Sequence, residues 1–292
     1  MLDYEPPVFR PPSEADNLII QATVGCSYNQ CTFCSMYTMK QYRARPLADV
    51  ESDIADWAAV RPEAHRVFLA DGDALTLDTE HLVAICDRLD ATFPELQRVS
   101  AYATPANLLK KTPGELERLK AHKLSLVYLG VETGDRDLLK RIRKGATPEG
   151  MEKALNKAAA AGLKVSATVI LGLGGRNRWQ AHVDNTAALL SRAPVTYLST
   201  LQLFLEPGAE KRFYERFGEP FAPQDDAGVL AEQERFLAAI DPPKPVIFRS
   251  NHASNALPLK GTLPKHRDQL LATLAQAREQ GSGLRPAFLR GL

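Results

Sequence analysis

Apolar runs of strand length alternate with amphipathic runs of helix length along most of this 292-residue chain. Six strands are expected, and helical spacing of apolar residues follows each of the first five. The expected strands cover residues 18–24, 66–70, 99–102, 124–131, 165–171 and 197–203. Parallel strands need long crossovers, and right-handed helical crossovers wind such a sheet toward a barrel. The sequence therefore predicts an α/β fold, an open parallel (β/α)6 partial TIM barrel with a C-terminal extension.

The alternation gives way to a different pattern beyond the sixth expected strand. Residues 241–245 are a stiff proline-rich connector, and residues 246–255 are expected to form a strand that runs into a polar turn. A helix is expected over 265–279, and the tail 281–292 is expected to be loose. This part of the chain has too little apolar content to fold alone. We therefore divide the chain into an N-terminal arm (1–16), a core (17–205) and a C-terminal extension that packs on the core (206–292).

Composition excludes several classes of protein. The net charge of +1 and the lack of a polybasic run make a nucleic-acid partner unexpected. No apolar run reaches the length of a membrane helix, and residues 1–14 lack the apolar core of a signal peptide. Three of the four cysteines lie in one short loop, which favours metal ligation over disulfides. We expect a cytoplasmic protein without a membrane partner.

That loop carries Cys26, Cys31 and Cys34, spaced C-x4-C-x2-C, directly after the first strand. Three thiolates can hold a four-iron cluster that leaves one iron open for a small molecule. A structural zinc ion takes four ligands, and neither a histidine nor a fourth cysteine is near in sequence. Chance clustering and a zinc site completed from elsewhere remain the alternatives. The fourth cysteine, Cys86, falls on the apolar side of an expected helix and is interpreted as buried.

Polar or glycine-bearing segments also follow three later strands, where ligands gather in parallel α/β folds. These segments are Asp71-Gly72-Asp73, Glu132 between Gly130 and Gly134, and the glycine-rich turn from Gly172 to Gly175. Carboxylates accept hydrogen bonds from amines and hydroxyls, and glycine lets a ligand approach the backbone. An Asp-Gly turn and a tight glycine turn are the structural alternatives.

The cysteine loop, with the aromatic Phe33 before its third cysteine, resembles the radical S-adenosylmethionine (radical SAM) superfamily. Its first cysteine gap is one residue longer than the usual C-x3-C-x2-C. The segment 130–134, Gly-Val-Glu-Thr-Gly, is similar to one in the group that includes methylthiotransferases and oxygen-independent coproporphyrinogen oxidases. The resemblance implies that Cys26, Cys31 and Cys34 bind a [4Fe-4S] cluster whose open iron chelates SAM.

The same resemblance implies which residues contact SAM. Asp73 stands where the family carries an acid that holds the amino group, and Lys144, or alternatively Arg143, stands where a basic residue pairs with the carboxylate. Basic residues at helix ends are often only partners of the helix dipole, so this alternative stays open. The full set of expected SAM contacts is Phe33, Asp71, Gly72, Asp73, Glu132, Arg143, Lys144, Ile170 and Gly172.

The reaction implied is reductive cleavage of SAM to methionine and a 5′-deoxyadenosyl radical, which abstracts hydrogen from a small-molecule substrate. A flavodoxin or ferredoxin would supply the electron. Two other functions remain open: an iron–sulfur or zinc-binding sensor or carrier without radical activity, and radical modification of RNA or protein.

A dense polar segment in the C-terminal extension is the expected substrate site. Its candidate substrate contacts are Arg249, Asn251, His252, Ser254 and Asn255. His252 is also a candidate acid or base. The structural alternative is a hydrogen-bonded turn. Tyr102, at the end of the third strand, is the second candidate catalytic residue, unless it only packs.

Overall fold

A computed structural model describes residues 2, 4–281 and 283–291 of the chain. Its main sheet contains β1 (Leu18–Gln21), β4 (Arg66–Ala70), β5 (Arg98–Ala103), β6 (Leu124–Glu132), β7 (Lys164–Leu171), β8 (Tyr197–Gln202), β9 (Val246–Ser250) and β10 (Leu259–Leu263). The strand order is β1-β4-β5-β6-β7-β8-β9-β10, and the pairs β1–β4, β4–β5, β5–β6, β7–β8 and β8–β9 are parallel. The predicted α/β class with a mostly parallel sheet is confirmed.

The chain divides into two compact units. Unit 1 comprises Met1–Asn29, Met36–Leu129 and Lys157–Val165, and unit 2 comprises Gln30–Ser35, Gly130–Asn156 and Ser166–Leu292. The predicted domain boundaries after residues 16 and 205 stay a prediction.

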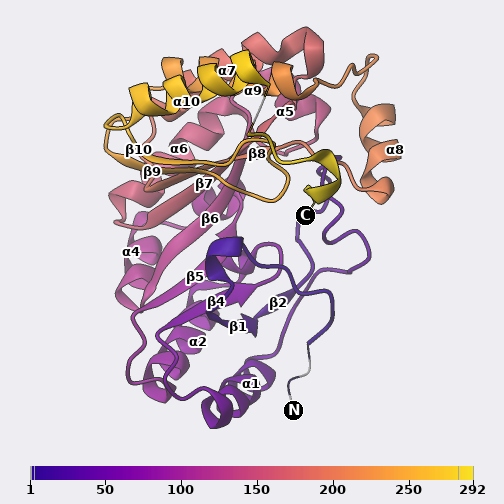
Figure 1. The fold of residues 1–292 in the computed structure, drawn as a ribbon. Coiled ribbons are helices and arrows are strands. Elements are labelled where there is room, and N and C mark those ends of the chain that lie inside the picture. Colours follow the sequence, from indigo (N-terminus) through magenta and orange to yellow (C-terminus); the bar gives the residue numbers. More distant parts are fainter. Residues whose placement is uncertain (1, 3, 282, 292) are drawn as a thin grey trace. The chain divides into compact units, whose positions relative to one another are not determined.

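Unit 1 contains β1, β4, β5 and the first part of β6, together with helices that lie wholly within it. These are α1 (Leu47–Val60), α2 (Thr79–Thr92), α3 (Pro105–Lys110) and α4 (Pro113–Ala121). Helices α1, α2 and α4 pack side by side along one side of these strands (Figure 1). Apolar residues at helical spacing, such as Val50 and Ile54, are buried there. Helix α4 begins with a capping box, in which Thr112 and Glu115 satisfy each other's backbone amides.

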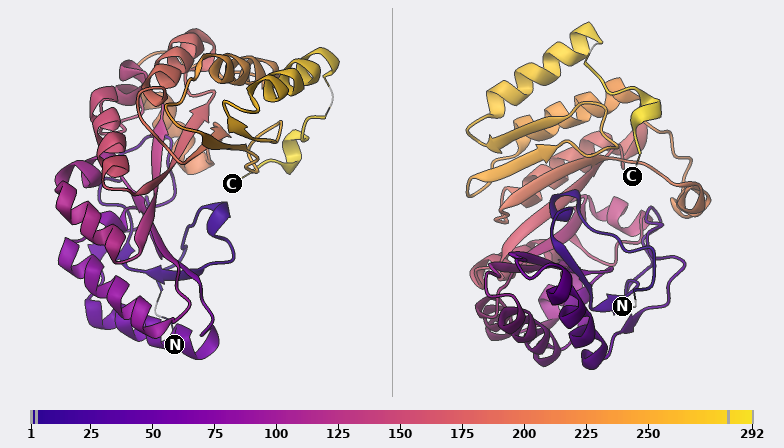
Figure 2. Two further views of the ribbon diagram at one scale, coloured as in Figure 1. Left: turned by 90° about the vertical axis from the view of Figure 1, so that its left-hand side faces the viewer. Right: turned by 60° about the horizontal axis from the view of Figure 1, so that its bottom comes forward.

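Unit 2 contains most of β7, with β8, β9 and β10. Its helices are α5 (Arg136–Arg141), α7 (Gly175–Leu190), α8 (Pro207–Arg216), α9 (Asp226–Ala239) and α10 (Arg267–Gln280), and α6 (Pro148–Ala160) begins in unit 2 and ends in unit 1. Helices α7, α9 and α10 lie next to one another over these strands (Figures 1 and 2). Buried Phe236 and Phe248 belong to the core between them.

The structure departs from the expected elements in several places. The first strand is interrupted at Ala22, because the following β2 (Thr23–Val24) pairs with β3 (Arg43–Ala44) in a separate two-stranded sheet. Helix α7 starts at Gly175, inside the glycine-rich turn, whereas the apolar spacing predicts a helix only from about Trp179. Helix α8 was not expected, although Phe213 and Phe217 are buried one turn apart. The strand expected from Val246 is β9, which extends the sheet in parallel, whereas the antiparallel strand β10 was not expected.

The C-terminal tail is not loose in the part that the structure describes. Arg285 donates hydrogen bonds to the carbonyl oxygens of His252 and Ala253, both at 2.8 Å. Arg290 forms a two-pronged ion pair with Asp226 at 2.6 and 2.7 Å. The expectation of a loose tail was wrong because its partners lie far away in sequence.

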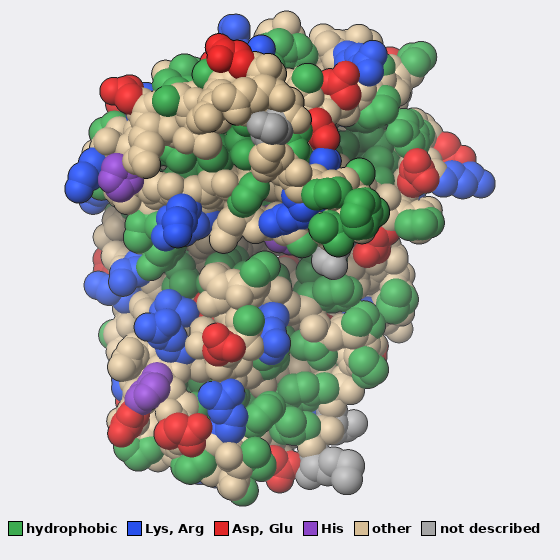
Figure 3. All heavy atoms as spheres, in the orientation of Figure 1, with side chains coloured by type: hydrophobic (Ala, Val, Ile, Leu, Met, Phe, Trp, Pro, Cys, Tyr) green, Lys and Arg blue, Asp and Glu red, His purple; other side chains and the backbone are tan. Residues whose placement is uncertain are grey.

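Charged side chains of both signs share the face of the molecule that one view shows. On the face drawn in Figure 3, basic and acidic side chains are scattered among one another. Among the described residues, none of the helices combines the length and the apolarity needed to cross a membrane.

Candidate functional site

In unit 1, the loop after β4 lies directly against the loop that carries Cys26. The amide of Gly72 donates to the carbonyl oxygen of Gly25 at 3.0 Å. A Cβ atom placed on Gly72 would lie 2.4 Å from Cβ of Cys26, closer than two carbon atoms can approach. Only glycine therefore allows this contact, and the structure brings together two of the predicted site residues, Gly72 and Cys26.

Asp71 is fully buried and organises the same loop. Its Oδ2 atom accepts hydrogen bonds from the amide of Gly25 at 2.8 Å and from the ammonium of Lys40 at 2.9 Å. Burial raises the pKa of Asp71, although the bonds from Lys40 and Gly25 oppose this shift. Its backbone is left-handed, with φ of 67°. These contacts give Asp71 a structural part beside the cysteine loop, and its binding to SAM stays a prediction.

Asp73 holds the residue after Cys26. Its Oδ1 atom accepts a hydrogen bond from the amide of Ser27 at 2.9 Å, and its Oδ2 atom accepts from the Ser27 and Thr76 hydroxyls. A carboxylate that accepts several hydrogen bonds fixes the backbone around it. Asp73 therefore positions the start of the cysteine loop.

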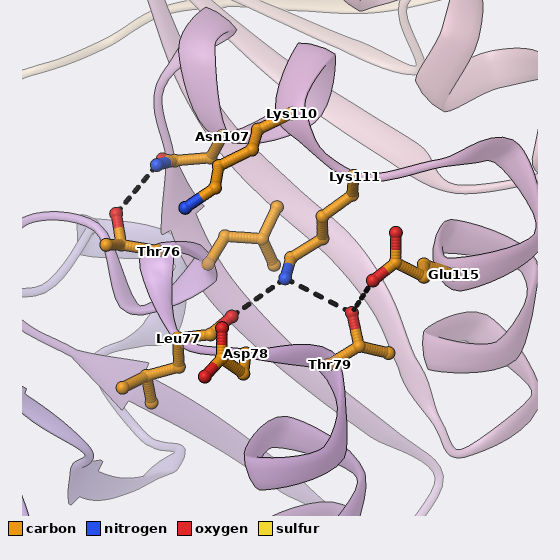
Figure 4. Close-up of a pocket in the computed structure, with 9 residues that line it drawn as sticks. Thr76, Leu77, Asp78, Thr79, Asn107, Lys110, Lys111 and Glu115 are labelled. Carbon is orange, nitrogen blue, oxygen red and sulfur yellow. Dashed lines mark hydrogen bonds between the residues drawn. The ribbon is translucent and has the colours of Figure 1, made fainter.

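A cavity of about 100 Å³ continues from Thr76 in unit 1. Asn107 donates a hydrogen bond to the hydroxyl of Thr76, and Lys111 donates one to the carbonyl oxygen of Leu77 (Figure 4). Each of these bonds is 2.7 Å long. Thr79 in turn donates to Glu115 at 2.8 Å. Burial lowers the pKa of Lys111. The polar groups named here thus form hydrogen bonds with one another along the wall of the cavity.

In unit 2, Cys31 and Cys34 lie in one turn. The amide of Cys34 donates to the carbonyl oxygen of Cys31 at 3.3 Å, and the amide of Thr32 donates to Ile142 at 2.9 Å. Both cysteine side chains are partly exposed, as is Cys26 in unit 1. The turn thus presents two thiols where a ligand can reach them.

Phe33 lies in the same turn and packs against an apolar cluster of unit 2 that includes Ile170, Leu173 and Phe213. Two residues expected to contact SAM, Phe33 and Ile170, therefore belong to one apolar surface. This agrees with both interpretations, an adenine contact and a core contact, and the SAM contact stays a prediction.

Glu132 and Lys144 form the second feature of unit 2. Lys144 Nζ lies 2.7 Å from Glu132 Oε1, and their side chains are only 13% and 8% exposed. Burial alone would lower the pKa of Lys144, but Glu132, Cys31 and Cys34 together raise it above its usual value. The structure therefore brings Glu132 and Lys144 together. Two of the predicted cluster ligands, Cys31 and Cys34, help to raise the pKa of the Lys144 ammonium. Arg143, the alternative to Lys144, is exposed.

Gly130 makes room for this ion pair. A Cβ atom at this position would lie 1.8 Å from Glu132 Oε1 and 2.8 Å from Lys144 Nζ. Glu132 itself has a left-handed backbone, with φ of 62°, which is uncommon for a residue other than glycine. Left-handed non-glycine residues cluster at functional sites.

The turn after β7 is held by residues that sequence reasoning missed. Gly172 has φ of 81°, and its amide donates to Glu232 Oε1 at 2.8 Å. His182 Nε2 lies 3.3 Å from the same oxygen, while its Nδ1 atom lies 2.7 Å from the hydroxyl of Thr133. This buried network ties the ends of β6 and β7. Its members are far apart in the chain, so no local pattern reveals them.

The expected substrate residues form a bonded turn in unit 2. Asn255 is buried and bonds to the amide of Gln202, the carbonyl oxygen of Thr200 and the hydroxyl of Ser250. His252 Nδ1 accepts from the amide of Ser254 at 3.1 Å. These contacts favour the alternative of a structural turn for Asn255 and Ser254.

The other candidates for substrate contact or catalysis are more accessible. Asn251 and Arg249 are exposed, and His252 is partly exposed. In unit 1, Tyr102 is also partly exposed and packs edge-on against Phe68 and Tyr128, with ring centroids 5.1 and 6.1 Å away. Their roles toward substrate stay predictions.

Within the part of the chain that the structure describes, no three Cys, His, Asp or Glu side chains are grouped as ligands of one metal ion. Cys31 and Cys34 share a turn of unit 2, and Cys26 belongs to unit 1. The set of three cysteine ligands therefore stays a prediction.

Comparison with solved structures shows that the fold is shared with known enzymes. Coproporphyrinogen III oxidase (HemN) from Escherichia coli is 13% identical, with a TM-score of 0.54 over 76% of this chain and 51% of that chain. Methylornithine synthase (PylB) is 14% identical, with a TM-score of 0.53 over 77% of this chain and 63% of that chain.

Sequence comparison is more specific. A putative methylthiotransferase from Methanocaldococcus jannaschii is 29% identical over 166 residues, which are 53% of this chain but only 35% of that relative. The sequence model of the radical SAM superfamily matches residues 20–187, more than half of the chain. The chain belongs to the radical SAM superfamily, whose enzymes use a [4Fe-4S] cluster and S-adenosylmethionine.

Proposed function

We propose that this enzyme binds its cluster through Cys26, Cys31 and Cys34 and uses it to initiate a radical reaction on a small-molecule substrate. When bound, the cluster and SAM together supply a 5′-deoxyadenosyl radical that abstracts hydrogen. The observation that carries the proposal is the buried ion pair of Glu132 and Lys144 at the end of β6.

The chemistry of these residues fits the two cofactors. Thiolates are the ligands of iron–sulfur clusters, and the thiols of Cys26, Cys31 and Cys34 are all partly exposed. Gly130 leaves a space that a Cβ atom would fill, so the acid and the amine can approach each other at the end of β6. A carboxylate and an ammonium side by side suit a ligand that itself carries an amine and a carboxylate.

The chain's own residues then have distinct tasks. Lys144 would bind the carboxylate of SAM, and Glu132 would accept hydrogen bonds from its amine or ribose hydroxyls. Gly172, whose amide is held by Glu232, would present bare backbone to the adenine beside Ile170. Asp73 would keep the backbone of Ser27 in place next to Cys26. His252 and Tyr102 are the proposed groups for substrate chemistry.

Transfer of a methylthio group is the second candidate, since the relative from Methanocaldococcus jannaschii carries that name. In this alternative, the substrate that the enzyme modifies would be RNA or protein instead of a small molecule. One feature weighs against a second iron–sulfur cluster as sulfur source, because the only further cysteine of this chain, Cys86, is buried. The reductant, which we expect to be a flavodoxin or ferredoxin, and a cytoplasmic location remain predictions.

The test is anaerobic reconstitution with iron and sulfide, followed by reduction and addition of SAM. We expect about four irons per chain for a [4Fe-4S] cluster, an electron paramagnetic resonance (EPR) signal that SAM perturbs, and release of methionine and 5′-deoxyadenosine. A Cys31→Ala chain should lose all three. Binding of zinc with survival of SAM would favour a zinc-binding carrier, and an iron–sulfur cluster that never cleaves SAM would favour a sensor.

A further inference from the structure

Helix α8 contacts the cysteine turn of unit 2 through one basic side chain. Arg212 donates hydrogen bonds to the carbonyl oxygens of Cys31 at 3.1 Å and Thr32 at 3.4 Å, and also to that of Cys34. Helix α8 lies outside residues 20–187, which match the superfamily model. Arg212 therefore reaches the cysteine turn from a helix outside the matched residues.

Two further contacts join the same segments. The hydroxyl of Ser35 donates to Glu206, the residue that precedes α8. Phe33 packs against the apolar cluster that contains Phe213 and Phe217 of the helix region. The turn is thus fixed by α8 on both sides of Cys34, and Arg212 is the only one of these groups that bonds to the cysteine backbone itself.

The chemistry of arginine explains why this residue type is suited to the place. A guanidinium carries five donors in a rigid plane, so that one side chain can hold several carbonyl oxygens at once. It also keeps its charge at every physiological pH. Only a few bonds separate the carbonyl oxygen of a cysteine from its sulfur, so the charge lies within about one Debye length, ~8 Å, of Cys31 and Cys34.

We propose that Arg212 is a positioning residue that holds the Cys31–Cys34 turn and makes the bound cluster easier to reduce. The inference rests on the proposed function, because it takes these cysteines as cluster ligands. Reduction adds a negative charge to a cluster, so a nearby positive charge raises its reduction potential. Arg212 supplies such a charge next to the backbone of Cys31 and Cys34.

The experiment compares the parent chain with Arg212→Gln, Arg212→Lys and Lys211→Gln. Lys211 neighbours Arg212 on the same helix, and its side chain is 84% exposed, so Lys211→Gln removes an equal charge without touching the turn. Each protein is reconstituted anaerobically. The midpoint potential is measured by EPR-monitored titration without SAM, and cluster stability by the rate of iron loss to a chelator.

We expect Arg212→Gln to shift the potential to more negative values and to lose iron about tenfold faster than the parent, the lower end of the effect of removing outer hydrogen-bond partners of a metal site. Arg212→Lys keeps the charge but cannot span three carbonyl oxygens, so it should lose iron faster while keeping the parent's potential. Lys211→Gln should match the parent in both measurements.

Parent-like potential and iron loss in Arg212→Gln would overturn the inference. If that variant folds, as judged by circular dichroism, but holds no cluster, the holding role is supported. The midpoint potential of Arg212→Lys then tests whether the positive charge makes the cluster easier to reduce. A shift to more negative potential in Arg212→Lys would contradict that part of the inference, because this variant keeps the charge. A parent chain that assembles no iron–sulfur cluster would instead contradict the proposed function, so the two failures are distinguishable.

Discussion

Lys144 Nζ lies 2.7 Å from Glu132 Oε1 in unit 2, and both side chains are nearly buried. The pair joins the end of β6 to the segment after α5. Burial disfavours the charge of Lys144, yet Glu132, Cys31 and Cys34 outweigh this effect and raise its pKa. The relationship places a permanent positive charge beside two cysteines.

Glu132→Gln tests this pair. The change keeps the shape of the side chain but leaves the ammonium of Lys144 without its counter-charge, so we expect a loss of about 3 kcal/mol in the free energy of unfolding, measured by urea titration without cofactors. The matched control is Glu149→Gln, whose partner Arg136 is 48% exposed, and it should lose far less. Equal losses in the two variants would contradict the buried character of the pair.

Gly130→Ala tests the space beside the pair. The added Cβ atom would lie 1.8 Å from Glu132 Oε1, so the pair must open, at a cost of about 1–3 kcal/mol for overpacking. Gly208→Ala in α8 is the control, since a Cβ atom there meets no other atom within 4 Å. That control should be neutral or slightly stabilising. Thermal unfolding of the two variants beside the parent checks the expectation.

Thr133→Val tests the network that ties β6 to β7. The Thr133 hydroxyl accepts a hydrogen bond from the amide of Asp135 at 2.9 Å and bonds to His182 Nδ1 at 2.7 Å. Both buried partners would lose their hydrogen bond to this hydroxyl, so we expect a loss of about 1–3 kcal/mol in unfolding free energy. Thr273→Val removes an exposed hydroxyl that bonds within its own helix, and it should change stability by less than about 0.5 kcal/mol. An unchanged Thr133→Val chain would show that the network contributes nothing.

We expect the stability of the folded chain to depend on pH through His252. Burial, and then the charge of Arg285, lower the pKa of His252 in the folded chain. The unfolded chain, with a pKa of about 6.5, therefore binds the proton first. Stability should fall as the pH drops below that value and continue to fall until the folded pKa is passed.

The measurement compares the parent with His252→Gln at pH 8 and at pH 5.5. At pH 8 the histidine is neutral in both states and contributes no pH-dependent term. At pH 5.5 the parent should have lost more unfolding free energy than the variant. The same loss in both chains would mean that His252 does not titrate differently on folding.

Cys86→Ala tests whether Cys86 stays outside the proposed set of cluster ligands. Cys86 is fully buried, and burial raises the pKa of its thiol to about 12, so it supplies no thiolate at neutral pH. We expect the variant to retain the parent's iron content after reconstitution, whereas Cys26→Ala and Cys34→Ala should not. Loss of iron in Cys86→Ala, in a chain that remains folded, would require a different ligand set.

Local pattern was enough to predict the regular part of the fold. Strand-length apolar runs at 66–70 and 124–131 correspond to β4 and β6, because burial on both faces of a parallel strand demands such runs. The glycines at 72 and 130 were also informative, since a close backbone approach excludes any other residue type. The apolar run that begins at Val246 also predicted a strand, which corresponds to β9. Its place in the sheet and the added strand β10 were harder to anticipate, because strand pairing depends on where a distant segment returns to the sheet.

For the candidate site too, some features follow from the sequence and others only from the tertiary structure. The amino-acid sequence by itself determined the cysteine spacing, the acidic strand ends and the membership in a superfamily, all of which are local or read in order along the chain. Only the tertiary structure decided that Glu132 pairs with Lys144, that Glu232 holds Gly172, and that Arg212 reaches the turn of Cys31. The last contact joins residues 181 positions apart. Such pairs are selected by the path of the folded backbone, which brings a long side chain within hydrogen-bonding distance of a partner that no sequence spacing specifies.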